Sequence, residues 1–159
     1  MRAFTKDRLQ KIFNFASQVE VGTAGELRFL ERYPCLSRKG LKECDFAMPN
    51  GQWVELKTDS RAEVDTGNFF FEVHSNLDRG TPGGPWQAYG KGADFFVYQF
   101  SCGAEWWFPC EPLILFLEKT NLQWEAKKIG NEGWAAAGLV VPVAAVKHLS
   151  VEVPVCLAR

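Results

Sequence analysis

The segment from Cys44 to Asp59, CDFAMPNGQWVELKTD, constrains the fold of this chain more than any other part of the sequence. Its Asn50-Gly51 dipeptide is a strong signal for a tight hairpin turn, because both residue types tolerate the backbone conformations that such turns need. We therefore predict two antiparallel strands, over residues 43–48 and 52–58, that fold back on each other at this turn.

The hairpin brings together three charged side chains with a definite chemistry. Asp45 and Glu55 come from adjacent strands, and Lys57 follows Glu55 by two residues, so that both project from the same strand face. Carboxylate oxygens of this kind suit Mg²⁺, which binds through one or two carboxylates and completes its shell with water and substrate phosphate. The other interpretation is that Glu55 and Lys57 form an ordinary solvent-facing cross-strand pair.

The composition limits the class of protein. With 159 residues, 47% hydrophobic and 23% charged, the chain has the length and composition of one globular domain. The net charge of −1 excludes a strongly basic nucleic-acid-binding protein, although the distribution of charge matters more than its sum. The sequence has no apolar run of membrane-spanning length and no signal-peptide core, so we expect a cytoplasmic protein with reduced, mostly buried cysteines.

Periodicity and turn residues predict an alternation of helices and strands. Apolar spacing favours an amphipathic helix over residues 4–19, and a capping box at Thr23 and Glu26 favours a second helix that Pro34 ends. The aromatic run 68–73 has the length and composition of a buried strand. The later elements are a short helix around Pro85–Tyr89, strands 93–100 and 105–108, a helix 111–119, a strand 138–143, a short helix 143–149 and an extended tail 150–156. This order indicates an α/β or α+β domain whose mixed sheet has helices on its faces.

At this point the chain resembles a known family, the PD-(D/E)xK nuclease superfamily, and especially its small phage-type members similar to Holliday junction resolvases and restriction endonucleases. The matching pieces are Gly25-Glu26, Cys44-Asp45, Glu55-Leu56-Lys57, the run 68–72 and the run 92–98. Cys44 replaces the proline of the family motif. The resemblance covers about residues 22–100, with a weaker similarity in 138–149. It implies a restriction-endonuclease-like core at 22–100 in a single nuclease-like domain, 1–159, with C-terminal additions at 101–159.

The resemblance also implies roles for the motif residues. Asp45, Glu55 and the main-chain carbonyl of Leu56 would hold Mg²⁺, for which Mn²⁺ substitutes, against a scissile phosphate. Lys57 would orient or deprotonate the attacking water, or stabilise the charge of the transition state. Glu26 would extend the acidic site, unless it serves only as the capping-box residue.

Further polar residues are candidates for contact with DNA. They are Arg38, Lys39, Lys42, Thr58, Ser60, Arg61, His74 and Gln87. Surface positions without a function remain the alternative for the basic residues and for His74. Glu72 either borders the acidic site or faces solvent at a strand end.

The leading functional hypothesis is a metal-dependent endonuclease that cuts branched or structured DNA in recombination, repair or phage DNA processing, in a bacterial or phage-infected cell. The alternatives are a restriction-type nuclease on duplex DNA, a non-catalytic DNA-binding protein that keeps the fold, and an unrelated α+β binding module. Cutting two symmetric strands calls for two active sites, so the first hypothesis also favours a homodimer.

Overall fold

The computed structural model describes residues 6–40, 42–120, 126–131 and 134–158. The helices are α1 (Lys6–Arg32), α2 (Glu63–Thr66), α3 (Gly84–Gly90), α4 (Cys110–Thr120) and α5 (Val143–Val146), with short 3₁₀ turns at Lys147–Leu149 and Val155–Leu157. The strands are β1 (Ser37–Arg38), β2 (Phe46–Ala47), β3 (Trp53–Asp59), β4 (Asn68–Asn76), β5 (Thr81–Pro82), β6 (Phe95–Phe100), β7 (Glu105–Pro109), β8 (Ala126–Asn131) and β9 (Trp134–Pro142).

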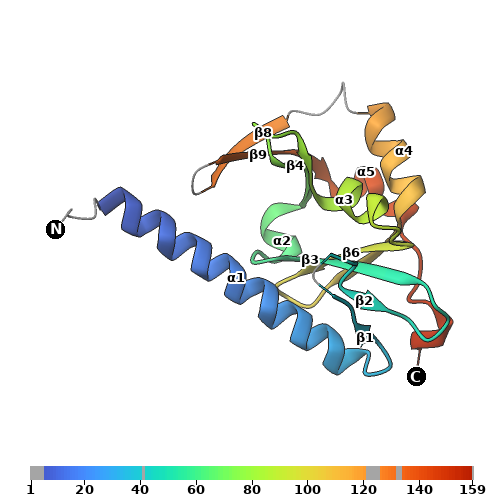
Figure 1. Cartoon of the computed structure of the whole chain (residues 1–159). Helices are drawn as coiled ribbons and strands as arrows, with labels where there is room; N and C mark the ends of the chain where they lie inside the picture. The colour runs from blue at the N-terminus through green and yellow to red at the C-terminus, as the bar shows by residue number, and fades with distance from the viewer. Residues whose placement is uncertain (1–5, 41, 121–125, 132–133, 159) are drawn as a thin grey trace.

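A five-stranded mixed sheet forms the centre of the molecule (Figure 1). Its strand order is β1-β2-β3-β6-β7, and all neighbours are antiparallel except β3 and β6. The predicted hairpin is confirmed, since β2 pairs with β3 in the register Phe46↔Val54 around the Asn50-Gly51 turn. The mixed α/β class with helices flanking this sheet is confirmed as well.

The strand predicted at 68–73 does not join that sheet. It is part of β4, which lies in a second, four-stranded antiparallel sheet of order β5-β4-β9-β8. The aromatic side chains of β4 explain this placement, because Phe69 and Phe71 are fully buried and make edge-to-face contacts with Tyr98 and Phe108 of the first sheet. The expected mixed sheet is present, but the strand at 68–73 is not a member of it and lies across its face in the second sheet.

The prediction of two N-terminal helices is also wrong. The chain forms one continuous helix, α1, whose first half extends away from the sheets in Figure 1. Thr23 and Glu26 lie inside this helix, so they form no capping box. The only unfavourable residue at the expected break is Gly22, and a single glycine costs a helix interior only about 1 kcal/mol.

Two buried clusters pack on opposite faces of the central sheet. The first lies between the sheet and α1 and includes Phe29, Val54, Val97 and Trp107. The second lies between the sheet, the second sheet and α4, and includes Phe69, Phe96, Tyr98, Leu113 and Leu139. Alternation along β6 feeds both clusters, because Val97 faces α1 whereas Phe96 and Tyr98 face the second sheet.

Two further expectations concern the burial of the cysteines and the presence of a membrane-spanning segment. All five cysteines are free thiols, but only Cys44 and Cys110 are buried, whereas Cys35, Cys102 and Cys156 are exposed, so the expectation of mostly buried cysteines is wrong. Among the described residues, no helix has both the length and the apolar character needed to cross a membrane.

Candidate active site

The side chains of strand β3 alternate between the apolar core and a pocket. Val54 and Leu56 point to the apolar cluster beneath α1. Glu55 and Lys57 point the other way, into a pocket between the two sheets. The period of two that was predicted from the Glu-x-Lys spacing is therefore present, and it separates the charged residues from the core.

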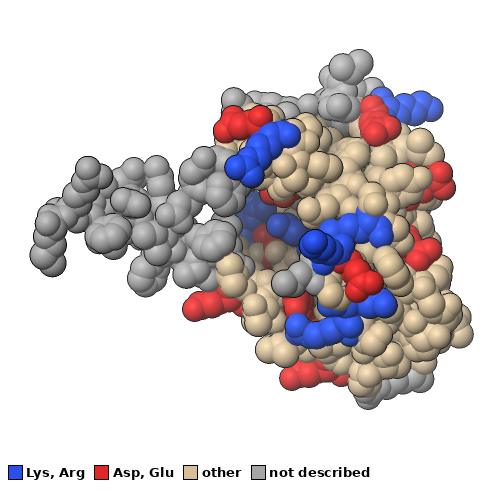
Figure 2. All heavy atoms as spheres, in the orientation of Figure 1, with Lys and Arg blue, Asp and Glu red and all other residues tan. Residues whose placement is uncertain are grey.

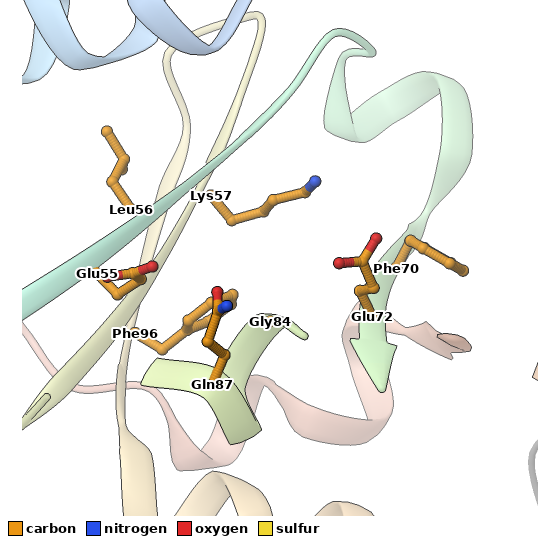
Figure 3. Close-up of a pocket in the computed structure, with 8 residues that line it drawn as sticks. All are labelled: Glu55, Leu56, Lys57, Phe70, Glu72, Gly84, Gln87 and Phe96. Carbon is orange, nitrogen blue, oxygen red and sulfur yellow. The ribbon is translucent and has the colours of Figure 1, made fainter. Parts of the chain in front are cut away.

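The pocket has a volume of about 150 Å³ and collects residues from β3, β4, α3 and β6 (Figure 3). Its lining consists of Glu55, Leu56, Lys57, Phe70, Glu72, Gly84, Gln87 and Phe96. In Figure 3 the amide of Gln87 rises from α3 between the carboxylates of Glu55 and Glu72. Four of the sequence candidates, Glu55, Leu56, Lys57 and Gln87, thus line one pocket.

Asp45 lies beside this pocket and is fixed by the backbone of β3. The register of the hairpin places Asp45 opposite Glu55, and the main-chain N–H of Leu56 donates a hydrogen bond of 2.8 Å to Asp45 Oδ2. Burial raises the pKa of Asp45 above its ordinary value. Burial and then the charge of Asp45 raise the pKa of Glu55, so the fold brings the two carboxylates together at an electrostatic cost.

Glu55 has one oxygen that is paired and one that is not. The Lys91 ammonium, at the end of α3, lies 3.0 Å from Glu55 Oε1. Glu55 Oε2 is buried and has no hydrogen-bond partner among the described residues. A buried carboxylate oxygen without a donor is costly, so this atom indicates a position prepared for a group from outside the chain.

Glu26 approaches the site from α1. Its carboxylate forms a 3.1 Å ion pair with Arg38 of β1, and its pKa is raised by burial and by the nearby charge of Asp45. The close approach of α1 is possible because Gly25 has no side chain: an added Cβ would overlap Thr58 of β3. The Gly25-Glu26 pair therefore has a structural role at the first residue and adds a carboxylate beside Asp45 at the second.

Glu72 is the pocket residue whose role the sequence left open. It lies in β4, where the register with β9 shifts between Glu72 and His74, and such bulges re-aim side chains. Gly83 and Gly84 leave room for it, since an added Cβ would come within 2.6 Å of Glu72 Oε1 at the first position and 2.7 Å of its carbonyl oxygen at the second. Burial raises the pKa of Glu72, and the opposing effect of Lys57 places these two charges close together.

The basic candidates before the motif lie on the surface. Arg38, Lys39 and Lys42 are exposed, and the Lys39 ammonium lies 5.2 Å from the centre of the Trp53 ring. Figure 2 shows lysine and arginine side chains gathered across the middle of one face, over the β1–β3 part of the central sheet, with acidic side chains among them. The face is basic locally although the whole chain is not.

Four of the other DNA-contact candidates lie away from the pocket. Thr58 packs against α1, and Ser60 lines a separate pocket of about 290 Å³ beside Arg28. Arg61 is held by the carboxylate of Asp59 at 3.0 and 3.1 Å. His74 lies in β4 opposite Ala137 and Pro82, and its Nδ1 is buried without a partner among the described residues.

Sequence reasoning missed Lys91. The residue stands between two glycines after a short helix, and nothing in that pattern indicates a contact with Glu55, which is 36 residues away along the chain.

The donor set fits a hard divalent cation. No group of three or more His, Cys, Asp or Glu side chains in the described part of the chain is arranged to hold a metal ion. Mg²⁺ does not require such a group, because it binds proteins through one or two carboxylates and keeps several waters. Asp45, Glu55 and the unpaired Glu55 Oε2 meet that requirement.

Comparison of the chain with models of known protein families finds no match, and neither curated protein sequences nor solved structures provide a significant one.

Proposed function

We propose that this protein is a metal-dependent endonuclease that hydrolyses phosphodiester bonds of DNA. The observation that carries the proposal is the pocket in which Glu55 and Lys57 lie together, with Asp45 on the adjacent strand and one Glu55 oxygen buried without a donor among the described residues. One carboxylate and an ammonium group in a half-buried pocket, with a second carboxylate beside it, match the needs of a phosphate bound through a divalent cation.

The positions of the side chains support the following roles. Asp45 and Glu55, with the main-chain carbonyl of Leu56, would hold Mg²⁺ or Mn²⁺, and Glu26 would extend this acidic group from α1. When bound, the ion supplies a water of lowered pKa and offsets negative charge on the phosphate. Lys57 places a fixed positive charge in the same pocket and orients the attacking water or stabilises the transition state. Gln87 donates its amide hydrogens to phosphate oxygens.

The substrate class is supported by the surface around the site. Arg38, Lys39 and Lys42 are exposed and precede the motif along the chain, and exposed cations of this kind would attract the DNA backbone. We assign branched or structured DNA as the substrate on the resemblance to junction-cutting enzymes, with duplex DNA as the alternative. A DNA-binding protein without catalysis is disfavoured because it has no need of intact Asp45, Glu55 and Lys57.

A cleavage assay tests the proposal. Four-way junction, flap, linear duplex and single-stranded DNA are incubated with the protein and Mg²⁺ or Mn²⁺. We expect cleavage of at least one substrate by the wild type, and none by Asp45→Ala or Lys57→Ala. The matched controls are Asp65→Ala and Lys119→Ala, which remove the same charges at exposed positions and should keep full activity.

Two outcomes would contradict the proposal. Cleavage that survives both Asp45→Ala and Lys57→Ala would show that another site, or a contaminant, cuts the DNA. Binding without cleavage in either metal would favour the non-catalytic alternative. Analytical ultracentrifugation with and without DNA tests the associated proposal of a homodimer, which predicts twice the mass of the 159-residue chain.

A further inference from the structure

A cation from the chain itself already lies at the acidic pair. Lys91 follows α3, and its ammonium is 3.0 Å from Glu55 Oε1, with 22% of the Lys91 side chain and 14% of the Glu55 side chain exposed. The positive charge also acts on Asp45, since for both carboxyl groups it opposes the rise in pKa that burial causes. The charge of Lys91 therefore acts on both Asp45 and Glu55, the two carboxylates that we propose as metal ligands.

The position of Lys91 is fixed by its backbone. Its N–H donates to the carbonyl oxygens of Gln87 and Ala88 at the end of α3, and its own carbonyl oxygen lies 4.0 Å from the buried Cys44 Sγ. Gly92 follows with a φ of +87°, a left-handed conformation that ends the helix there. The lysine is thus delivered to Glu55 by a defined helix end, next to the cysteine that precedes Asp45.

We propose that Lys91 is a built-in competitor for the metal site: its ammonium occupies Glu55 in the metal-free protein, and a divalent cation must displace it to bind there. This inference rests on the proposed function, because the ion concerned is that of the nuclease site. The displacement keeps a positive charge at Glu55, because the Lys91 ammonium leaves the carboxylate when the divalent cation binds to it. Lys91 in this way sets the concentration of divalent cation above which the site fills.

Electrostatics gives the physical reason. An ammonium and a divalent cation on the same small carboxylate pair repel each other strongly in a half-buried environment, so both cannot stay in contact with Glu55. A charge-assisted hydrogen bond must be broken before the ion gains that oxygen. Glu55 Oε2, which has no donor among the described residues, offers the ion a first contact before the ammonium leaves.

Metal binding measured without DNA tests the proposal. Mn²⁺ is titrated into wild type, Lys91→Met and Lys91→Arg, and free Mn²⁺ is followed by electron paramagnetic resonance. Lys91→Met removes the competitor at similar side-chain length, so we expect at least about tenfold tighter binding. Lys91→Arg keeps a cation and should stay close to wild type. Lys119→Met, at an exposed position, controls for the loss of one positive charge.

Folding is followed in the same samples by circular dichroism and thermal unfolding. Metal-free Lys91→Met leaves Glu55 without its cation, so its unfolding midpoint should fall and then recover with Mn²⁺ by more than that of wild type. If Lys91→Met does not fold without metal, Lys91→Gln takes its place, because glutamine keeps a donor without the charge.

The outcomes separate the two proposals. Tighter binding by Lys91→Met alone, or binding by this variant where wild type shows none, supports the competition. Equal or weaker binding by Lys91→Met, with wild type still binding Mn²⁺, overturns the competition and leaves the metal site in place. If none of the folded proteins binds Mn²⁺ at millimolar concentration, both the competition and the proposed metal site are overturned.

Discussion

Glu55 and Asp59 lie on the same face of β3, four residues apart, yet their surroundings shift the pKa values of the two carboxyl groups in opposite directions. Asp59 is 7% exposed, and both of its oxygens accept hydrogen bonds, from Tyr98 at 2.7 Å and from the main chain and guanidinium of Arg61. Burial would raise the pKa of Asp59, but these bonds from Arg61 and Tyr98 lower it below its ordinary value. Among the residues that the structure describes, Glu55 has the side chain of Lys91 as a partner at one oxygen and no partner at the other, and its pKa is raised.

The difference shows how one strand carries two kinds of buried carboxylate. Asp59 is satisfied entirely by the chain, so its negative charge stabilises the fold at the end of β3 and β6. Glu55 keeps an acceptor that no described part of the chain uses, beside the further carboxylate of Asp45, and this lowers the stability of the fold. A carboxylate held at such a cost is typical of a functional site.

The largest expected effect is on DNA cleavage. Glu55→Gln should lower metal-dependent cleavage by at least about 100-fold, because a neutral amide is a poor ligand for a hard cation. Asp59→Asn should keep most of the activity at a temperature where the protein is folded. Rates are compared on the substrate that wild type cuts best. Equal losses in both variants would show that the two carboxylates do not differ in function.

Stabilisation by metal should separate the same two variants. At a concentration of Mg²⁺ one hundred times its dissociation constant, binding adds about 2.7 kcal/mol to the free energy of unfolding, which raises the midpoint by about 5–10 °C for a chain of this size. Differential scanning calorimetry should show this rise in wild type and in Asp59→Asn, but not in Glu55→Gln. A rise of the same size in Glu55→Gln would place the ion elsewhere.

Without metal, Asp59→Asn should be the more damaging of the two variants, because it should lose more stability than Glu55→Gln. Asp59→Asn weakens four hydrogen bonds to a buried charge and should lower the free energy of unfolding by about 2 kcal/mol. Glu55→Gln also removes the burial cost of a charge, so its change should be below about 1 kcal/mol. Urea unfolding in the presence of a chelator measures both values. A larger loss in Glu55→Gln would mean that its pair with Lys91 is mainly structural.

The smallest effect is the dependence of stability on pH. The folded-state pKa values of Asp45 and Glu55 are raised, so their contribution to stability is present at low pH and is lost as the pH rises through those values. The pKa of Asp59 is lowered, so its contribution is present above its ordinary value of 3.8 and is lost as the pH falls further.

Metal-free wild type should therefore gain stability as the pH falls from neutral toward 4.5, the ordinary value for Glu, and lose it below about the ordinary Asp value of 3.8. Glu55→Gln should show a smaller gain, and Asp59→Asn a smaller loss. Urea midpoints measured across this range provide the test, and an unchanged gain in Glu55→Gln would assign it to other groups.

The sequence predicted the elements that depend on neighbouring residues. The Asn50-Gly51 turn fixes the hairpin locally, and the spacing of Glu55 and Lys57 fixes their common face. The contact of Lys91 with Glu55 could not be predicted from the sequence. It depends on the parallel pairing of β3 with β6, which sets where α3 ends relative to β3.

The second sheet escaped prediction for the same reason. The residues of β4 indicate a buried strand, but not whether its neighbour is β3, which is close in sequence, or β9, which is distant. The choice is made by the packing of Phe69 and Phe71 on the central sheet, a tertiary effect that overrides local order. The continuous α1 is a similar case, since its contact with β3 at Gly25 supports residues that a capping signal would place at a helix start.

The pairing of β4 with β9 has a consequence for the order of events during synthesis. A nascent chain that has left the ribosome as far as α4 already contains the hairpin with Asp45, Glu55 and Lys57, but β4 still lacks its long antiparallel neighbour. The wall of the pocket that holds Glu72 therefore closes only after residues 134–142 have emerged. The charged residues of the site are thus made early and their enclosure late, so any activity that needs the closed pocket should appear only after residues 134–142 have emerged.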